Sequence, residues 1–408
     1  YTTSWSKPHF FDREAERSVS RGKFRHDTMK SDEFRTPLYY KAIRERVQQA
    51  GPGVLTFLDL GTGPFALMAI EAARAGAKRV YAIEAVAADA QLAREAVAAA
   101  GFGAIVKVIE GLSTRVTLPE KVDVLVSEIV GSVASEEGLY ATISDAHERH
   151  VKHPTDPRSW IPHRCQTVGA PATHVMQPAY GFFQWLEKSR RTQKSKSLIR
   201  PHCDDRTLML LAPPAVLEDV RFNDPETLLG VGRHTLTKDV ATFYIHQSAL
   251  NANEAQLHAA LMDAGADAAD ADIYASVAVR SLSGIGMWPR LELDPDAQLV
   301  VQARGKDGGY QPSNWRTLLP FAREQPVAVK HGSTVMARLH VELSNAISGD
   351  EADAPHYTLD TAVSGVPDEP GDVRKVLYKL DAPLRQVHFR RMAQWWADWG
   401  AQRSNESK

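Results

Sequence analysis

A glycine turn between a predicted strand and a predicted helix constrains this chain more than any other feature. Residues 58–71 read LDLGTGPFALMAIE, an apolar run that contains Asp59, a turn with Gly61 and Gly63, and a helical stretch. Glycine adopts backbone conformations that other residues avoid, so it permits a tight turn and a close approach of backbone to ligand. A turn of this kind at the carboxyl end of a strand indicates a ligand site of the nucleotide-binding type.

The turn lies in a region where helical and extended patterns alternate. Apolar spacing predicts, in order, a helix at 34–47, a strand at 54–60, helices at 65–77 and 88–101 separated by a strand at 79–85, and strands at 104–111 and 122–129. The last run, VDVLVSEI, is apolar enough for a parallel strand buried on both faces. The first half is therefore predicted to be a doubly wound α/β sheet.

The second half has a different pattern. Three prolines in residues 153–163 exclude a long helix there. Short extended runs follow at 241–247, 273–282, 297–304, 333–343 and 356–363, with one helical pattern at 253–272. This half is predicted to be β-rich, a sandwich or a barrel, and 408 residues are enough for two domains.

Two further segments have a marked composition. Residues 187–200 contain six basic side chains among fourteen, which is typical of a solvated loop or projecting arm, or of a surface for an anionic partner. Residues 384–400 predict a helix with a wide apolar stripe suited to core packing. The stripe consists of Leu384, Val387, Met392, Trp395, Trp396 and Trp399.

Composition excludes several classes of function. Cys165 and Cys203 are the only cysteines, too few for a disulfide framework or a four-thiolate metal site. The formal net charge of −2 gives no global attraction to nucleic acid or to an anionic membrane. There is no apolar span of about 18 residues and no signal peptide pattern. We expect a cytoplasmic protein without a bound metal.

The glycine turn fits two kinds of cofactor. Gly61, Gly63 and Ala66 match the G-x-G-x-x-G/A fingerprint of a dinucleotide site, which would suit an NAD-dependent dehydrogenase. They also suit S-adenosylmethionine. Glu84 ends the next predicted strand, where a carboxylate accepts hydrogen bonds from ribose hydroxyls in either case. Pro64 lacks a backbone N–H that a phosphate would use, which favours S-adenosylmethionine.

A pair of glutamates follows the last predicted strand of the α/β region. Glu128 and Glu137 stand nine residues apart in SEIVGSVASEEG, at the sheet edge where α/β proteins bind ligands. Two carboxylates in one pocket repel each other unless a cation lies between them, and a planar guanidinium matches two-point contact with a carboxylate. The alternative is that both side chains are solvated on the surface.

Taken in order, six motifs resemble the protein arginine methyltransferase family. They are HDTMKSDEFRTPLYYKAI at 26–43, LDLGTGPFAL at 58–67, VYAIEA at 80–85, KVDVLVSEIVGSVASEEG at 121–138, SNWRTLLPF at 313–321 and PVAVKHG at 326–332. The resemblance covers roughly residues 24–345. It implies a Rossmann-like S-adenosylmethionine-binding domain followed by a β-barrel domain with an inserted dimerisation arm, and a homodimer.

The resemblance also implies a division of the chain. Residues 1–33 would form an N-terminal segment that covers the cofactor site, and residues 34–161 the S-adenosylmethionine-binding domain. Residues 162–370 would form the β-barrel substrate domain, with the arm at about 182–212. Residues 371–408 would form a C-terminal helix.

The family's functional residues carry over to matching positions. Arg35 would hold the cofactor's carboxylate, Glu84 its ribose, and Leu112 and Ser113 its adenine; Glu128 and Glu137 would grip the guanidinium and act in catalysis. The other implied cofactor-binding residues are Met29, Asp59, Gly61 and Gly63, and Asn314 and Trp315 would line the substrate slot. The implied product, after methyl transfer from S-adenosylmethionine to arginine, is S-adenosylhomocysteine.

Three departures from the family pattern leave alternatives open. Phe65 stands at the usual third glycine, Asn314 replaces a histidine, and the N-terminal aromatic motif is missing. The alternative that they support is that this chain is a catalytically silent partner of a homologous methyltransferase. As an enzyme, the chain is nearest the monomethylating branch and would give omega-N-monomethylarginine. Its substrate would be peptidyl arginine, or free L-arginine in specialised-metabolite biosynthesis.

Overall fold

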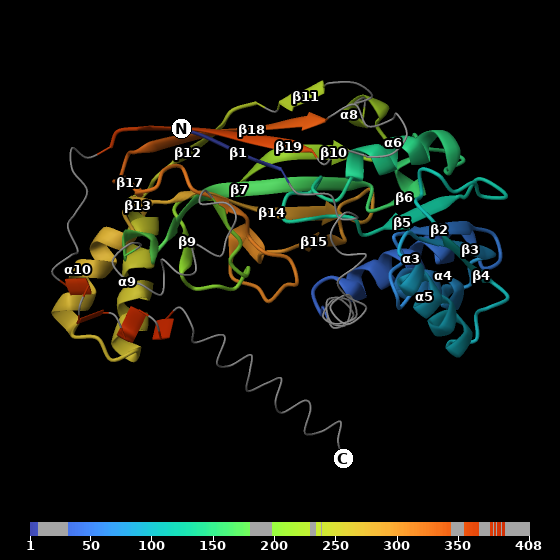
Figure 1. Ribbon diagram of the computed structural model, residues 1–408, viewed down its shortest axis with the longest axis horizontal. Helices are drawn as coiled ribbons and strands as arrows, with labels where there is room; N and C mark the ends of the chain where they lie inside the picture. The colour runs from blue at the N-terminus through green and yellow to red at the C-terminus, as the bar shows by residue number, and fades with distance from the viewer. Residues whose placement is uncertain are drawn as a thin grey trace, which may run out of the picture.

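The computed structural model of the chain describes residues 1–6, 32–179, 198–228, 234–237, 239–343, 355–366 and 376–387 except 378, 381 and 385. A parallel sheet flanked by helices is followed by two antiparallel sheets that curve over each other (Figure 1). This architecture confirms the predicted α/β sheet followed by a β-barrel.

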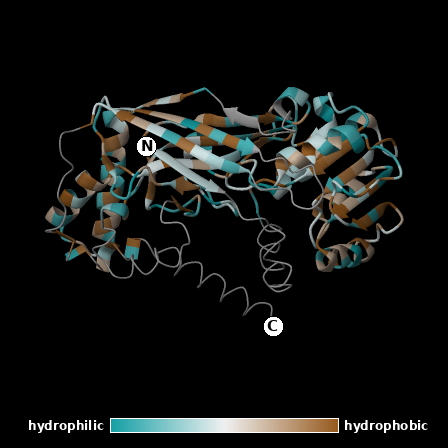
Figure 2. Cartoon of the chain, turned by 45° about the horizontal axis from the view of Figure 1, so that its top comes forward, coloured by the Kyte–Doolittle hydropathy of each residue, from teal (hydrophilic) through white to brown (hydrophobic). Residues whose placement is uncertain are grey.

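The parallel sheet has the strand order β4-β3-β2-β5-β6. Its strands are β2 (Thr56–Leu60), β3 (Arg79–Glu84), β4 (Val106–Glu110), β5 (Val124–Ser127) and β6 (Trp160–Ile161). Its helices are α3 (Thr36–Ala50), α4 (Leu67–Ala75), α5 (Ala87–Ala99) and α6 (Leu139–Arg149). All residues of β2 and β5 are buried, and for β5 the continuous apolar run predicted this. Hydrophobic residues accordingly gather on the strands of this part (Figure 2).

The strand order reverses between β2 and β5. From β2 the chain proceeds to β3 and β4 on one side of the sheet, then returns to add β5 on the other side of β2. Leu60 and Ser127 are register partners at the ends of these two strands. Ligands of open α/β sheets bind at such a reversal, and here it places the glycine turn after β2 beside Glu128 after β5.

The barrel consists of two five-stranded antiparallel sheets, one with β10-β7-β14-β15 and β9, the other with β1-β19-β18-β11 and β12. The first contains β7 (Arg164–His174), β9 (Leu208–Leu210), β10 (Ala215–Arg221), β14 (Gly284–Glu292) and β15 (Val300–Gln302). The second contains β1 (Thr2–Ser6), β11 (His234–Thr237), β12 (Ala241–Tyr244), β18 (Thr334–Leu343) and β19 (His356–Ser364).

Shorter elements complete this half of the chain. Two strand pairs join β8 (Leu198–Ile199) to β16 (Leu319–Pro320) and β13 (Ser281–Leu282) to β17 (Val327–Ala328). A short helix α8 spans Pro225–Leu228, and 3-10 turns lie at Pro157–Ser159, Gln177–Ala179 and Lys306–Gly308.

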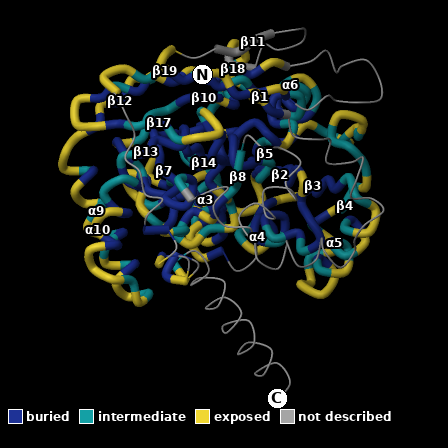
Figure 3. Tube along the Cα trace, turned by 60° about the vertical axis from the view of Figure 1, so that its left-hand side comes forward, coloured by how far each residue is buried: buried dark blue, intermediate teal, exposed yellow. Residues whose placement is uncertain are grey.

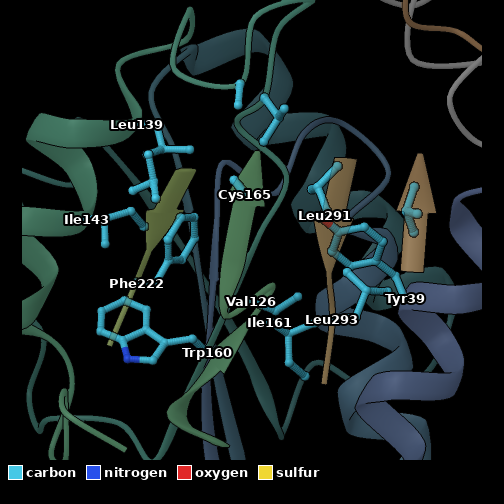
Figure 4. Close-up of a cluster of buried hydrophobic side chains, with 14 of the residues drawn as sticks. Tyr39, Val126, Leu139, Ile143, Trp160, Ile161, Cys165, Phe222, Leu291 and Leu293 are labelled. Atoms are coloured by element: carbon cyan, nitrogen blue, oxygen red, sulfur yellow. The ribbon is translucent and has the colours of Figure 1, made fainter. Parts of the chain in front are cut away.

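One hydrophobic core extends across the junction of the two halves. Buried residues continue from the parallel sheet into the barrel (Figure 3). Figure 4 shows Val126 and Ile161 of the sheet near Cys165, Leu291 and Leu293 of the barrel. The shared core fixes the carboxyl edge of the parallel sheet against the barrel.

The predicted extended run 273–282 is wrong over most of its length. Residues Ala268–Ala278 form helix α10, which packs against α9 (Gln247–Asp263), and within this run only Ser281–Leu282 are extended. Asp267 caps α10, because its side chain accepts hydrogen bonds from the N–H groups of Ala269 and Asp270. Tyr274 is buried in a second hydrophobic cluster and Val277 is partly buried there, and this packing outweighs their local preference for extended structure.

The C-terminal segment contributes to the same cluster. Val376, Leu377, Leu380 and Leu384 are buried against residues of α9 and α10, and Val387 is partly buried there. The rest of the predicted apolar stripe lies beyond the described residues. So do residues 7–31 of the predicted N-terminal cover and residues 182–197 of the predicted arm. Residues 2–6 form β1, which pairs with β19 in the barrel.

No helix in the described parts of the chain is both long and apolar enough to cross a membrane.

Candidate active site

The glycine turn after β2 is held by a buried carboxylate. Gly61 and Gly63 have φ values of 75° and 65°, in the left-handed region that glycine favours. Asp59 Oδ2 accepts hydrogen bonds from Thr62 Oγ1 at 2.5 Å and from the N–H of Ala69 at 2.9 Å. Burial raises the pKa of Asp59 to about 6. Asp59, predicted to bind the cofactor, therefore has its Oδ2 directed at the turn and at the start of α4.

We expect Gly63→Ala to lower the free energy of unfolding by about 1–2 kcal/mol, because a left-handed conformation is strained for a residue with a Cβ. Gly103→Ala is the matched control, since Gly103 has no positive φ and a Cβ there would meet no atom within 4 Å. Urea unfolding of both variants measures the difference. An equal loss of stability in the two variants would contradict the strain argument.

Glu84 lies at the end of β3 beside the turn. Its Oε2 accepts a hydrogen bond from the N–H of Gly63 and its Oε1 one from the N–H of Val86, both at 2.9 Å. The side chain is buried, and burial raises its pKa above the ordinary value. A carboxylate has about four acceptor positions, so Glu84 can still accept hydrogen bonds from a ligand's hydroxyl groups.

The two residues predicted to flank an adenine follow the neighbouring strand β4. Leu112 and Ser113 are both partly buried. Helix α6 holds this loop, because the Ser113 carbonyl accepts hydrogen bonds from Arg149 Nη2 at 2.6 Å and His150 Nε2 at 3.0 Å. The turn, Glu84 and this loop follow three adjacent strands along one edge of the sheet.

An ion pair joins the start of α3 to the end of β5. Arg35 Nη1 lies 2.7 Å from Glu128 Oε2, and their side chains are only 4% and 11% exposed. Glu128 Oε1 is buried and has no hydrogen-bond partner among the residues that the structure describes. The pKa of Glu128 is raised to about 7, mainly by burial; the Arg35 charge opposes this rise, and the Glu137 charge adds to it.

The second predicted glutamate is placed differently. The Glu137 side chain is exposed, although its charge acts on Glu128. Its neighbour Glu136 is buried and forms a two-point ion pair with Arg200. Sequence reasoning missed Glu136 and Arg200. They are 64 residues apart, so no local spacing connects them, and the only signal was the acidic doublet itself.

The loop before β16 closes this side of the site. Trp315 Nε1 donates a hydrogen bond to the Val130 carbonyl at 2.8 Å, and its ring centroid is 5.7 Å from the Arg35 guanidinium carbon. Asn314 Nδ2 donates to Asp32 Oδ2 at 3.2 Å. Asp32 Oδ1 in turn accepts from the N–H of Arg35 at 3.1 Å. Asp32 thus links the loop to α3, a role the sequence did not reveal, while Met29 lies outside the described residues.

These contacts gather most of the predicted site at one edge of the sheet. Arg35, Glu128 and Trp315 contact or face one another, and the glycine turn lies beside them, since a Cβ on Gly61 would be 3.4 Å from Ile129 Cγ2. The barrel, the sheet and the start of α3 all contribute. The site therefore places the buried Glu128 carboxylate beside the backbone of the glycine turn.

Comparison with known proteins finds relatives that are named as arginine methyltransferases. No family model matches the chain. Protein arginine N-methyltransferase PRMT10 of Arabidopsis thaliana is 37% identical over 138 residues, which are 33% of this chain and 35% of that protein. The arginine N(omega)-methyltransferase of Streptomyces achromogenes subsp. streptozoticus is 37% identical over 115 residues, 27% of this chain and 32% of that protein. These matches thus span about a third of the curated relatives.

Solved structures agree over a longer part of the chain. The PRMT1 enzyme-prozyme heterotetrameric complex of Trypanosoma brucei, solved with AdoHcy, contains a chain with a TM-score of 0.56 at 18% identity. The match covers 83% of this chain and 97% of that one. Arabidopsis thaliana protein arginine methyltransferase 10, in an open conformation, gives 0.53 at 18% identity and covers 82% and 97%. The chain is therefore similar to protein arginine N-methyltransferases in sequence over about a third of its length, and in fold over most of it.

Proposed function

We propose that this protein is an arginine N-methyltransferase that uses S-adenosylmethionine. The observation that carries the proposal is Glu128. One of its carboxylate oxygens is paired with Arg35, and the other is buried without a hydrogen-bond partner among the described residues. A buried acceptor of this kind is costly unless a donor meets it, and a guanidinium N–H is a fitting donor.

The residues at the sheet edge fit the proposed cofactor. The positive φ values of Gly61 and Gly63 allow the backbone to approach a ligand closely, and Glu84 can accept hydrogen bonds from ribose hydroxyls. Arg35 lies at this edge and would contact the cofactor's carboxylate as well as Glu128. When bound, S-adenosylmethionine supplies an electrophilic methyl group on a sulfonium.

The glutamates would prepare the arginine to react. A guanidinium has a pKa of about 13 and is a poor nucleophile because its lone pairs are delocalised. Glu128 and Glu137 would hold positive charge on the nitrogens that are not methylated, which leaves the third nitrogen free to attack. One proton leaves when methylarginine forms, and the exposed Glu137 can pass it to solvent. Orientation and preorganised charge supply the acceleration.

The proposal extends to the substrate and the product. The relatives named above include methyltransferases for arginine in proteins and one for arginine itself. We propose free L-arginine, in specialised-metabolite biosynthesis, or peptidyl arginine as substrate. The proposed product is omega-N-monomethylarginine, made by a cytoplasmic homodimer.

The decisive experiment incubates the protein with labelled S-adenosylmethionine and either free arginine or an arginine-rich peptide. Mass spectrometry of the products would identify monomethylated and dimethylated arginine, and relative turnover would assign the substrate. Absence of methylarginine with both substrates would refute the proposal.

The two alternatives make different predictions. A silent partner would co-purify stoichiometrically with an active homologue, whereas an isolated homodimer that turns over refutes this reading. An NAD-dependent dehydrogenase would show quenching of tryptophan fluorescence by NADH. We expect S-adenosylhomocysteine to quench it instead.

We expect Glu84→Gln to weaken S-adenosylhomocysteine binding about 10- to 100-fold. An amide offers its NH₂ group where the carboxylate now accepts from a backbone N–H, and hydrogen bonds to a charged group contribute about 1.5–3 kcal/mol. Glu110→Gln is the matched control, because Glu110 pairs with Glu84 in register but is exposed. Calorimetry measures both affinities. Equal losses would show that Glu84 has no special place in the site.

A further inference from the structure

The loop that carries the two proposed catalytic glutamates contains a third glutamate that faces away from solvent. The side chain of Glu136 is 0% exposed, whereas that of Arg200 is 33% exposed. Arg200 Nη2 lies 2.7 Å from Glu136 Oε1, and Arg200 Nη1 lies 3.1 Å from Oε2. Two parallel N–H to carboxylate contacts fix orientation as well as distance.

Glu136 also organises the backbone of its own loop. Its Oε2 accepts hydrogen bonds from the N–H of Ser132 at 3.0 Å and from the N–H of Val133 at 3.4 Å. The loop folds so tightly that a Cβ on Gly131 would be 2.6 Å from Glu136 Cβ and 2.7 Å from its Oε2. The carboxylate therefore closes the loop between Glu128 and Glu137.

The backbone around Arg200 is held by hydrogen bonds to the segment around β16. Arg200 follows β8, which pairs with β16, and its carbonyl accepts a hydrogen bond from Arg316 Nη1 at 3.2 Å. The N–H of Thr317 donates to the Pro201 carbonyl at 3.0 Å. The same segment carries Trp315, which holds the Val130 carbonyl. The paired segments around β8 and β16 thus contact the loop between Glu128 and Glu137 at two places. Trp315 contacts it near Glu128, and Arg200 contacts it near Glu137.

The barrel holds the loop from another direction. Ser135 Oγ and the Tyr357 hydroxyl are 2.8 Å apart, and the N–H of Ala134 donates to Thr167 Oγ1 at 2.9 Å. Thr167 Oγ1 donates to the buried Glu218 at 2.5 Å. The backbone next to Glu136 is therefore anchored even without Arg200, so substitutions in the ion pair should leave the protein folded.

We propose that Glu136 and Arg200 are positioning residues, whose ion pair sets the distance between Glu128 and Glu137. This inference rests on the proposed function, because it assigns to the pair the spacing of the two substrate-binding carboxylates. Neither residue needs to contact the substrate. Arg200 belongs to the basic run at 187–200, and this contact gives one of its charges a place in the site.

The test uses Glu136→Gln, Arg200→Met and the double variant, with Arg79→Met as control, since Arg79 forms an exposed ion pair with Glu120. We expect kcat to fall about 100-fold in each single variant, because a misplacement of about 1 Å can cost that much. The double variant should lose no more than Glu136→Gln alone. Arg200→Lys should recover part of the loss, and S-adenosylhomocysteine affinity should stay within about twofold of wild type.

Hydrogen exchange gives a readout that does not depend on turnover. The amides of Ser132 and Val133, which donate to Glu136 Oε2, should exchange faster in Glu136→Gln and Arg200→Met than in wild type, and no faster in Arg79→Met. Unchanged exchange, or losses of kcat that multiply in the double variant, would overturn the proposal. A wild-type protein without methyl transfer would instead refute the proposed function, while the exchange result would still decide whether the pair positions the loop.

Discussion

Glu128→Gln is expected to lower kcat about 100- to 1,000-fold, the range found when one preorganised electrostatic contact to a transition state is removed. Glutamine keeps the size and one acceptor oxygen but carries no negative charge, so it cannot localise the positive charge of the substrate guanidinium. The glycine turn and Glu84 are unchanged in this variant. Calorimetry should therefore show S-adenosylhomocysteine binding within a few fold of wild type.

The matched control is Glu148→Gln, on the exposed face of α6, which should leave both kcat and cofactor affinity unchanged. A Glu128→Gln variant that binds S-adenosylhomocysteine normally and turns over at the wild-type rate would exclude Glu128 from catalysis. Loss of binding and turnover together would point to a disturbed fold, which circular dichroism would detect.

The second large effect is a pH dependence of kcat/KM, which reports groups of the free enzyme. Burial raises the pKa of Glu128 to about 7, and only the ionised form can attract a guanidinium. We expect kcat/KM to fall about tenfold for each pH unit below 7 and to level off above it. Rates at constant ionic strength between pH 5 and 9 would show the acid limb.

Arg35 provides an internal check of this assignment. Because its charge lowers the pKa of Glu128, Arg35→Gln should move the acid limb to higher pH when the cofactor is saturating. An acid limb that stays in place would mean that another group titrates.

The raised pKa of Glu128 also makes the free energy of unfolding depend on pH. The pKa of Glu128 in the folded protein lies above its ordinary value of 4.5. The folded state therefore holds this proton more tightly than the unfolded chain. The contribution of Glu128 to the free energy of unfolding is fully present below about pH 4.5 and is lost as pH rises through about 7.

Local patterns predicted the part of the fold that positions the glycine turn. The run VDVLVSEI, which contains β5, is apolar enough to indicate burial on both faces, and β5 is buried throughout. The error at residues 273–278 has the opposite origin. Val277 and Tyr274 favour an extended structure locally, but the Asp267 cap and packing against α9 determine a helix.

The site was predictable only where a motif was contiguous or matched the family. The Arg35 contact with Glu128 joins residues 93 positions apart, and the sequence assigned Arg35 only to the cofactor. Asp32 and Glu136 were missed for the same physical reason. Their partners, Asn314 and Arg200, reach them through the packing of the barrel against the sheet, and that packing has no signature in the local sequence.

The pairing of β1 with β19 has a consequence for the order of events during synthesis. Thr2–Ser6 emerge from the ribosome long before their partners, because they pair with His356–Asp360, 350 to 358 residues later in the chain. The parallel sheet is complete once residue 161 has emerged, and domains can fold as they are made. The second barrel sheet must wait, because contacts between distant residues form slowly and need both partners. A nascent chain can therefore hold a finished parallel sheet while β1 waits for its partner strand.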